Sequence, residues 1–146
     1  MIIFYICVKY SCLLSCIFII QTFKTNMKYY ENKPQGYYDN VREEMLKYLP
    51  ENAKKVLDIG CGNGAFASVV KDKNKAEVWG IELMEVEAKV AVDVLDKVFV
   101  GNCEKYINGL PEKYFDVIYM NDVLEHLVDP YTVLETLKSK LAPNGV

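Results

Sequence analysis

Three glycines alternate with other residues directly after an apolar segment, and a carboxylate stands two residues before the first of them. The segment reads VLDIGCGNGAF and contains Asp58, Gly60, Gly62 and Gly64. Glycines at such a turn let the backbone approach a ligand and present amide N–H groups at the start of the next helix. Glu82 lies 22 residues after Gly60. At that distance, an acid at the end of a second strand can accept hydrogen bonds from ribose hydroxyls.

The charge of Asp58 helps to decide which ribose-containing ligand the glycine turn binds. The glycines alone also satisfy the relaxed dinucleotide pattern, which ends here at Ala65. A pyrophosphate on these amides would face the Asp58 carboxylate, with a repulsion of about 1 kcal/mol or more at surface dielectric. A ribose ligand that carries a cation and no phosphate avoids this repulsion. S-adenosyl-L-methionine, with a sulfonium and an ammonium beside its adenosine, is such a ligand.

The elements that must position these residues alternate along the chain. Apolar runs predict strands at 55–59, 76–82, 97–101 and 114–120. Helical spacing predicts helices at 38–49, 64–72, 84–95, 103–108 and 130–141, and it aligns Val86, Val90 and Val94 in the third of them. Val146 resembles the start of another strand. This order predicts a parallel α/β sheet of the Rossmann-like kind, whose ligands bind at the carboxyl ends of the strands.

Two longer motifs resemble those of a known family. VLDIGCGNG is similar to the first motif of the class I S-adenosylmethionine-dependent methyltransferases, and FDVIYMNDVLEHLVDP with LKSKLAPNGV is similar to their later strand, helix and turn. The similarity runs from about residue 37 to residue 146 in the family's order, and is greatest to small-molecule enzymes associated with glycan biosynthesis. A complete domain of this family has seven strands. The resemblance therefore implies an incomplete sheet of about four, a C-terminally truncated fragment with residues 27–146 as the cofactor-binding half.

The resemblance implies roles for the residues at the first two strand ends. Asp58 would order the glycine loop and favour the methionine ammonium of the donor. Glu82 would accept the ribose hydroxyls, with Leu83 packed on the adenine. The residues expected to line the methionine moiety are Gly60, Cys61, Gly62 and Gly64.

Further roles are implied beyond these strands. Asn102 and Cys103 would meet the adenine edge, where the family commonly has an Asp followed by a small residue. Asn121 would lie near the transferred methyl group. Two residues before the first strand, Tyr38 and Arg42, would close over the cofactor, with the arginine on the methionine carboxylate; a solvated helix face is the other interpretation.

His126 is the only histidine in the sequence. It is a candidate general base that would take the proton from an acceptor hydroxyl. The alternative is that it caps or packs in a helical turn, because a sulfonium is a strong methyl donor and proximity alone can suffice.

Composition limits the partners and the compartment. Without Lys9 and Lys24, the basic residues of segment 1–26, the remainder has 15 basic against 20 acidic residues, which argues against nucleic acid as a partner. The five cysteines are an odd number with three in the first sixteen residues, so they predict no disulfide framework and favour a reducing, cytoplasmic location. Ile19 stands where a third iron–sulfur ligand would be needed after Cys12 and Cys16, so no metal site is predicted.

Residues 1–26 differ from the rest of the chain. They are almost wholly apolar through residue 23, close to the length that spans a bilayer. Two interpretations stay open, namely a membrane anchor through residues 2–23 and an extension that the domain does not need. A secretory signal fits poorly because there is no positive start and no small-residue cleavage site.

Two functions follow from the sequence. The first is methyl transfer from S-adenosyl-L-methionine to an oxygen, or less readily a nitrogen, of a small molecule or glycan precursor, leaving S-adenosyl-L-homocysteine. The second is a non-catalytic remnant or a nucleotide-binding module of the dinucleotide Rossmann type.

Overall fold

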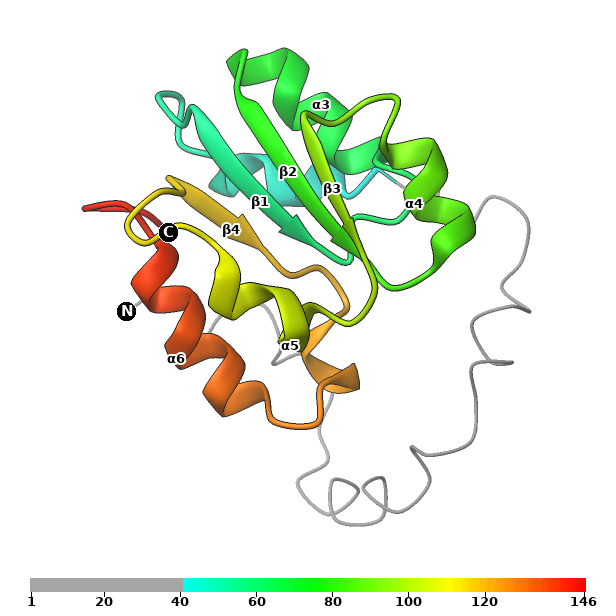
Figure 1. The fold of residues 1–146 in the computed structure, drawn as a ribbon. Helices are drawn as coiled ribbons and strands as arrows, with labels where there is room; N and C mark the ends of the chain where they lie inside the picture. The colour runs from blue at the N-terminus through cyan, green and yellow to red at the C-terminus, as the bar shows by residue number, and fades with distance from the viewer. Residues whose placement is uncertain (1–40) are drawn as a thin grey trace.

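Four parallel strands form the central sheet of the computed structural model, which describes residues 41–146 (Figure 1). They are β1 (Lys55–Ile59), β2 (Glu77–Glu82), β3 (Lys97–Val100) and β4 (Val117–Tyr119), in the spatial order β3-β2-β1-β4. The chain runs outward from β1 to β3 and then returns to place β4 on the other side of β1. Strand order therefore reverses at β1, which is where open parallel sheets bind ligands. The predicted Rossmann-like α/β class is confirmed.

Helical segments connect these strands. They are η3 (Glu43–Tyr48), α3 (Ala65–Asn74), α4 (Glu85–Ala91), α5 (Cys103–Tyr106), η4 (Ile107–Gly109), η5 (Leu124–His126) and α6 (Pro130–Lys140), where η marks a 3-10 helix. The helix predicted at 38–49 is described from residue 41 onward, where the structure forms the short 3-10 helix η3. Tyr48 is exposed there, while Met45 and Leu49 are buried.

Helices η3 and α3 cover one face of the sheet. Val56 of β1 shares a buried cluster with Phe66 and Val70 of α3, because alternate residues of a strand face the same side. Tyr119 of β4 lies in the same cluster and meets Phe66 edge-on, with ring centroids 5.0 Å apart. This face carries the turn between β1 and α3, so it supports the glycine loop.

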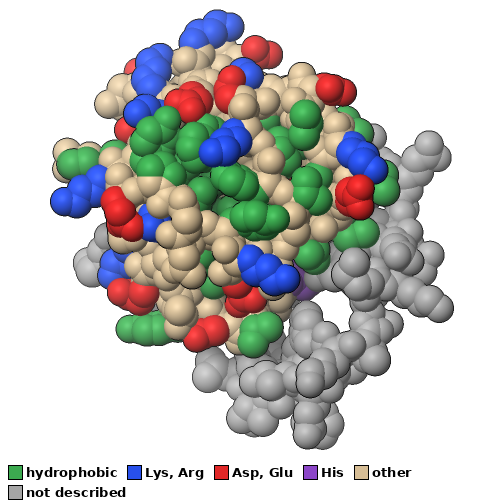
Figure 2. Space-filling view, in the orientation of Figure 1, with side chains coloured by type: hydrophobic (Ala, Val, Ile, Leu, Met, Phe, Trp, Pro, Cys, Tyr) green, Lys and Arg blue, Asp and Glu red, His purple; other side chains and the backbone are tan. Residues whose placement is uncertain are grey.

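The opposite face has helices only over part of its area. Leu57 of β1 shares a buried cluster with Val133 and Leu137 of α6, as the helical spacing predicts. Figure 2 shows hydrophobic side chains gathered over the strands on this face. Trp79 and Phe99, half-buried on β2 and β3, are 6.2 Å apart between ring centroids. These aromatic side chains therefore cover the part of the β2–β3 surface that the short helix α5 does not cover.

Helix α4 is shorter than the predicted helix and turns a different side to the sheet. Val86 and Val90 are 70% and 52% exposed, whereas Ala88 and Ala91 are completely buried. The small alanine side chains let α4 approach the glycine loop closely. A Cβ built on Gly64 would lie 3.4 Å from the Cα of Ala91. The aligned valines predicted the helix correctly but do not form its buried face.

Strand β4 is shorter than the predicted strand at 114–120. Phe115 instead forms an isolated bridge with Leu141, and the Asp116 carboxylate accepts hydrogen bonds from the backbone N–H groups of Lys54 and Lys55 at the start of β1. On the outer edge, the N–H of Ile118 donates to the carbonyl of Val146 and the N–H of Val146 donates to that of Asp116, both at 2.9 Å. Val146 therefore makes backbone hydrogen bonds with the outer edge of β4, and the strand predicted to begin there stays a prediction.

The search for membrane-spanning segments covers the described part of the chain. Within residues 41–146 no helix has both the length and the apolar character that crossing a bilayer requires. The predicted anchor at 2–23 lies outside the described residues, as does Tyr38.

Candidate functional site

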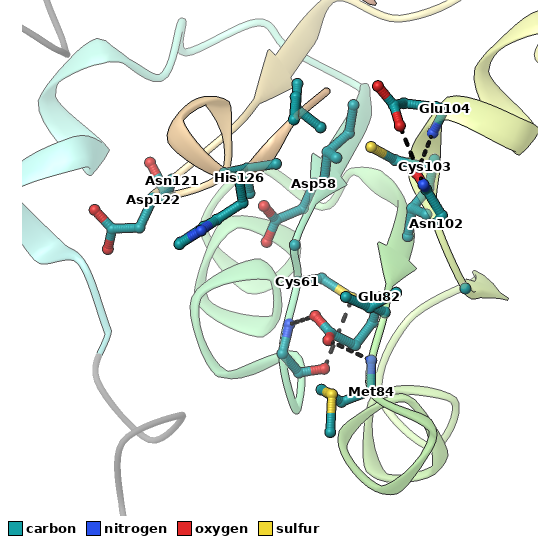
Figure 3. Close-up of a pocket in the computed structure, with 18 of the residues that line it drawn as sticks. Asp58, Cys61, Glu82, Met84, Asn102, Cys103, Glu104, Asn121, Asp122 and His126 are labelled. Carbon is teal, nitrogen blue, oxygen red and sulfur yellow. Dashed lines mark hydrogen bonds between the residues drawn. The ribbon is translucent and has the colours of Figure 1, made fainter. Parts of the chain in front are cut away.

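A pocket of about 480 Å³ opens at the carboxyl ends of the strands (Figure 3). This volume lies within the usual range for small-molecule sites. Asp58 lies near its middle; Asn121, Asp122 and His126 lie on one side and Asn102, Cys103 and Glu104 on the other. The strand-end residues expected from the sequence are therefore gathered around one cavity.

The glycine loop takes a backbone form that side chains disfavour. Gly60 has a φ of 77°, and a Cβ at this position would collide with the Cγ2 of Val123. Gly62 has a φ of 55° and is buried. The glycines therefore let the β1 turn and the segment after β4 approach each other at the floor of the pocket.

Glu82 holds this loop in place. Its carboxylate accepts hydrogen bonds from the N–H of Gly62 at 2.9 Å and from the N–H of Met84 at 2.7 Å, and the side chain is buried. Burial raises the pKa of Glu82, and the backbone N–H groups partly offset that rise. Because a carboxylate has about four acceptor positions, Glu82 keeps capacity for a further hydrogen-bond donor.

Asp58 is buried at the end of β1 and lines the pocket. Burial, and secondarily the charge of Glu82, raise the pKa of Asp58 to about 7. The bonds that the structure shows to the loop come from Glu82 and from the Ile81 carbonyl, which accepts from the N–H of Gly60 at 2.7 Å, so an ordering role of Asp58, directly or through water, stays a prediction. The carboxylate of Asp58 instead faces the cavity, where a cation would favour its ionised form.

The two pocket cysteines are packing residues. Burial raises the pKa of both thiols, so neither is a ready thiolate at neutral pH. A Cβ on Gly80 would lie 2.6 Å from the Sγ of Cys61, which shows that the thiol fills the space this glycine leaves. Cys103 is buried at the start of α5.

On the β3 side of the pocket, Asn102 also serves the start of a helix. Asn102 is the N-cap of α5: its side chain accepts from the N–H of Glu104 at 2.8 Å and donates to the Glu104 carboxylate at 3.1 Å. These bonds commit the Asn102 amide to the helix start. Leu83 is 41% exposed and lines the pocket, where it offers an apolar surface.

The remaining predicted residues lie on the β4 side. Arg42 forms ion pairs with Asp122 and, at 3.7 Å, with Glu44, and it lines the pocket together with Asp122. Asn121 follows β4 and lines the pocket. His126 ends η5, and its backbone N–H donates to the carbonyl of Val123 at 2.9 Å. The helical turn that was the alternative for His126 is therefore present, and the side chain also lines the pocket.

Sequence reasoning missed several lining residues, among them Phe66, Met84, Glu104 and Val123. Glu104 could have been found, because an Asn followed two residues later by an acid is a helix-start pattern. Val123 could not, since its contact with Gly60 depends on how two separate loops meet. Within residues 41–146 no group of three or more His, Cys, Asp or Glu side chains is placed to hold a metal ion.

Comparisons with known proteins agree with this geometry. A family described as "Methyltransferase domain" matches residues 29–146. The chain is 33% identical over 115 residues to a ubiquinone biosynthesis O-methyltransferase from Histophilus somni, covering 69% of this chain and 48% of the relative. It is 29% identical over 133 residues to the 27-O-demethylrifamycin SV methyltransferase of Amycolatopsis mediterranei, covering 79% of this chain and 49% of that one.

Solved structures show the same fold. A SAM-dependent methyltransferase from Archaeoglobus fulgidus superposes with a TM-score of 0.65 at 27% identity, over 80% of this chain and 54% of that one. The chain spans about half the length of the curated relatives it matches. From its family match and its fold, the chain belongs to the methyltransferase domain family, among the class I S-adenosylmethionine-dependent methyltransferases.

Proposed function

We propose that this chain binds S-adenosyl-L-methionine at the strand ends and directs its methyl group to an oxygen of a small molecule, leaving S-adenosyl-L-homocysteine. The observation that carries the proposal is the charge of the pocket. Among the described residues that line it, four are carboxylates, Asp58, Glu82, Glu104 and Asp122, and one is a guanidinium, Arg42, already paired with Asp122. Such a lining favours a cationic ligand over an anionic one.

The residues present fit the parts of this donor. Asp58 would hold the ammonium of the methionine part, because a cation offsets the cost of a buried carboxylate. Glu82 would accept the ribose hydroxyls with the oxygen capacity left by Gly62 and Met84. Leu83 would pack on the adenine. The donor supplies an electrophilic methyl group on a sulfonium, and the chain supplies binding and orientation.

The dinucleotide alternative is disfavoured by the loop amides. A pyrophosphate needs free N–H groups at the turn. The N–H of Gly60 donates to Ile81, that of Gly62 to Glu82, and that of Gly64 to the carbonyl of Cys61, at 2.7, 2.9 and 2.9 Å. The three glycine amides are therefore already used inside the protein, and a phosphate would have to displace these bonds.

The relatives support an oxygen acceptor on a small molecule. Their names give a ubiquinone biosynthesis O-methyltransferase and a 27-O-demethylrifamycin SV methyltransferase. These names favour a small-molecule oxygen over the glycan precursor that the sequence resemblance suggested. His126 lines the β4 side of the pocket, where it would receive the acceptor proton if a base is used.

Binding and transfer are tested separately on the full chain. Titration with S-adenosyl-L-methionine and with NAD⁺ should give binding of the first ligand and none of the second. Incubation with the donor carrying a labelled methyl group, beside catechol and a simple sugar, should place label on the catechol oxygen. Binding of NAD⁺ without binding of the methyl donor would overturn the proposal, whereas donor binding without transfer would support the non-catalytic alternative.

A further inference from the structure

Tyr119 has a buried hydroxyl without a hydrogen-bond partner. Among residues 41–146, its hydroxyl oxygen is the one buried side-chain polar atom in this condition, and the residue is 5% exposed. A buried polar group that lacks a partner is unfavourable, and a phenylalanine would fill nearly the same space without that cost. The hydroxyl therefore calls for an explanation beyond packing.

The position of Tyr119 places it directly behind the pocket wall. It pairs with Asp58 across the β1–β4 ladder, and in a parallel pair such partners point to the same face of the sheet. Its ring also contacts Phe66, which lines the pocket, as Asp58 does. Burial, and after it the negative charge of Asp58, raise the pKa of Tyr119 to about 12, so its hydroxyl keeps its proton at neutral pH and remains a donor.

Several other titratable or charged groups surround Asp58. Those that face it or line the same pocket are Glu82 from β2, Cys61 from the glycine loop, Arg42 before η3, Glu104 of α5, and Asp122 and His126 after β4. Glu82 and Cys61 oppose ionisation of Asp58 or keep their own protons. Arg42 is paired with Asp122 and Glu44. From α3, Phe66 is the pocket-lining residue, and it does not titrate.

We propose that Tyr119 is a positioning residue of the methyl-donor pocket, whose hydroxyl donates a hydrogen bond to the Asp58 carboxylate, directly or through one water, when that carboxylate is ionised. This inference rests on the proposed function, because a cationic donor is what requires Asp58 as an anion. A buried anion needs a hydrogen-bond donor, and the unpartnered hydroxyl beside it on the same face of the sheet is that donor. Tyr119 thus sets the pH above which the Asp58 carboxylate is ionised and can hold the cationic part of the ligand.

The test compares Tyr119→Phe with the wild-type full chain, with Tyr114→Phe as a matched control. Tyr114→Phe also removes one hydroxyl, but that hydroxyl donates to the carboxylate of Glu77 at the start of β2, the end away from the pocket. Affinity for S-adenosyl-L-methionine is measured from pH 5.5 to pH 9, and comparison at each pH cancels titration of the donor's own amine. The pH of half-maximal binding should rise by about one unit in Tyr119→Phe, with a loss of about tenfold below it and convergence at high pH. Tyr114→Phe should follow the wild type.

A ligand-free readout separates this inference from the proposed function. The pH dependence of the free energy of unfolding reports the Asp58 pKa without any methyl donor. In Tyr119→Phe, the fall of this free energy with rising pH should end about one pH unit higher than in the wild type. If the wild type binds no donor, the proposed function fails and the unfolding profile still tests the pair. An unshifted profile in Tyr119→Phe, in binding or in unfolding, would overturn the role of Tyr119. Should Tyr119→Phe not fold, Tyr119→Leu removes the same hydroxyl and takes its place.

Discussion

The two walls of the pocket are built differently. At the ends of β1 and β2, Asp58 and Glu82 are buried, and Glu82 is bonded to backbone N–H groups on both sides. After β4 the wall consists of a turn and the short helix η5; His126 is exposed there and Val128 is 86% exposed. The first wall is held by hydrogen bonds between buried groups, whereas the second carries an ion pair between the partly exposed side chains of Arg42 and Asp122.

This difference between the walls fits two roles, namely binding of the methyl donor and binding of the acceptor. A donor that is the same for every member of a family is served by a wall whose geometry is fixed. An acceptor that varies is served by exposed side chains that can change without loss of the fold. We therefore expect substitutions in the β1–β2 wall to alter stability and donor binding strongly, and those in the β4 wall to alter them little.

The largest effect is expected from Asp58→Asn. The pKa of Asp58 is raised in the folded state, so its contribution to stability is fully present below the unfolded pKa of about 3.8 and is lost as the pH rises to about 7. Between these two pH values, the free energy of unfolding of the wild type should fall by an amount on the order of 4 kcal/mol, and that of Asp58→Asn should not show this fall. Urea unfolding at pH 4 and pH 8 measures it. Parallel pH profiles in both proteins would show that Asp58 is not buried as a carboxylate.

Gly60→Ala tests whether the two walls meet at the floor of the pocket. The φ of 77° and the collision with Val123 should lower the free energy of unfolding by about 2–3 kcal/mol. Gly109→Ala is the matched control, because a Cβ there meets nothing within 4 Å. Denaturant midpoints for the two variants give the comparison. Equal, small effects would mean that Gly60 is not under this constraint.

Asn102→Ala should act through the helix start more than through the ligand. Loss of the N-cap bond to Glu104 is expected to cost about 1 kcal/mol of stability. Donor affinity should fall only a few-fold, since the Asn102 amide is committed to α5. Thermal unfolding and calorimetry on the same samples separate the two effects. A large loss of affinity with unchanged stability would restore the adenine contact that the family resemblance implied.

His126→Ala should have the smallest effect on binding. Its side chain lies on the exposed wall, so donor affinity should change by less than about twofold, and a general base would contribute about 100-fold or more to the methylation rate. Pre-steady-state transfer rates therefore decide between a base and a helical-turn residue. A rate that is unchanged in His126→Ala would assign catalysis to proximity alone.

Local signals account for what the sequence predicted well. Strand β1 and the glycine turn are specified by an apolar run and by residues whose backbone freedom is intrinsic, so both were located to the residue. The ladder positions that make Tyr119 a neighbour of Asp58 depend instead on how β4 crosses back to β1. No spacing within one segment encodes that pairing.

Other features required the assembled fold. Periodicity aligned the valines of α4, but the sheet receives Ala88 and Ala91 because α4 packs closely at Gly64. The role of Glu82 in holding Gly62 joins residues 20 positions apart. The family resemblance implies that Asn102 contacts the adenine edge, and the structure shows that its side chain also caps α5. A residue at a strand end can serve either purpose, and its hydrogen bonds decide which.

We infer that the β1–β2 wall binds the adenosine of a methyl donor through Glu82. Calorimetric titration of the full chain with S-adenosyl-L-homocysteine tests it, with Glu82→Gln beside Glu77→Gln, which alters a carboxylate at the other end of β2. Circular dichroism confirms that each variant is folded. We expect binding by the wild type and by Glu77→Gln, and an affinity about 100-fold lower in Glu82→Gln. Equal affinity in all three proteins would contradict it.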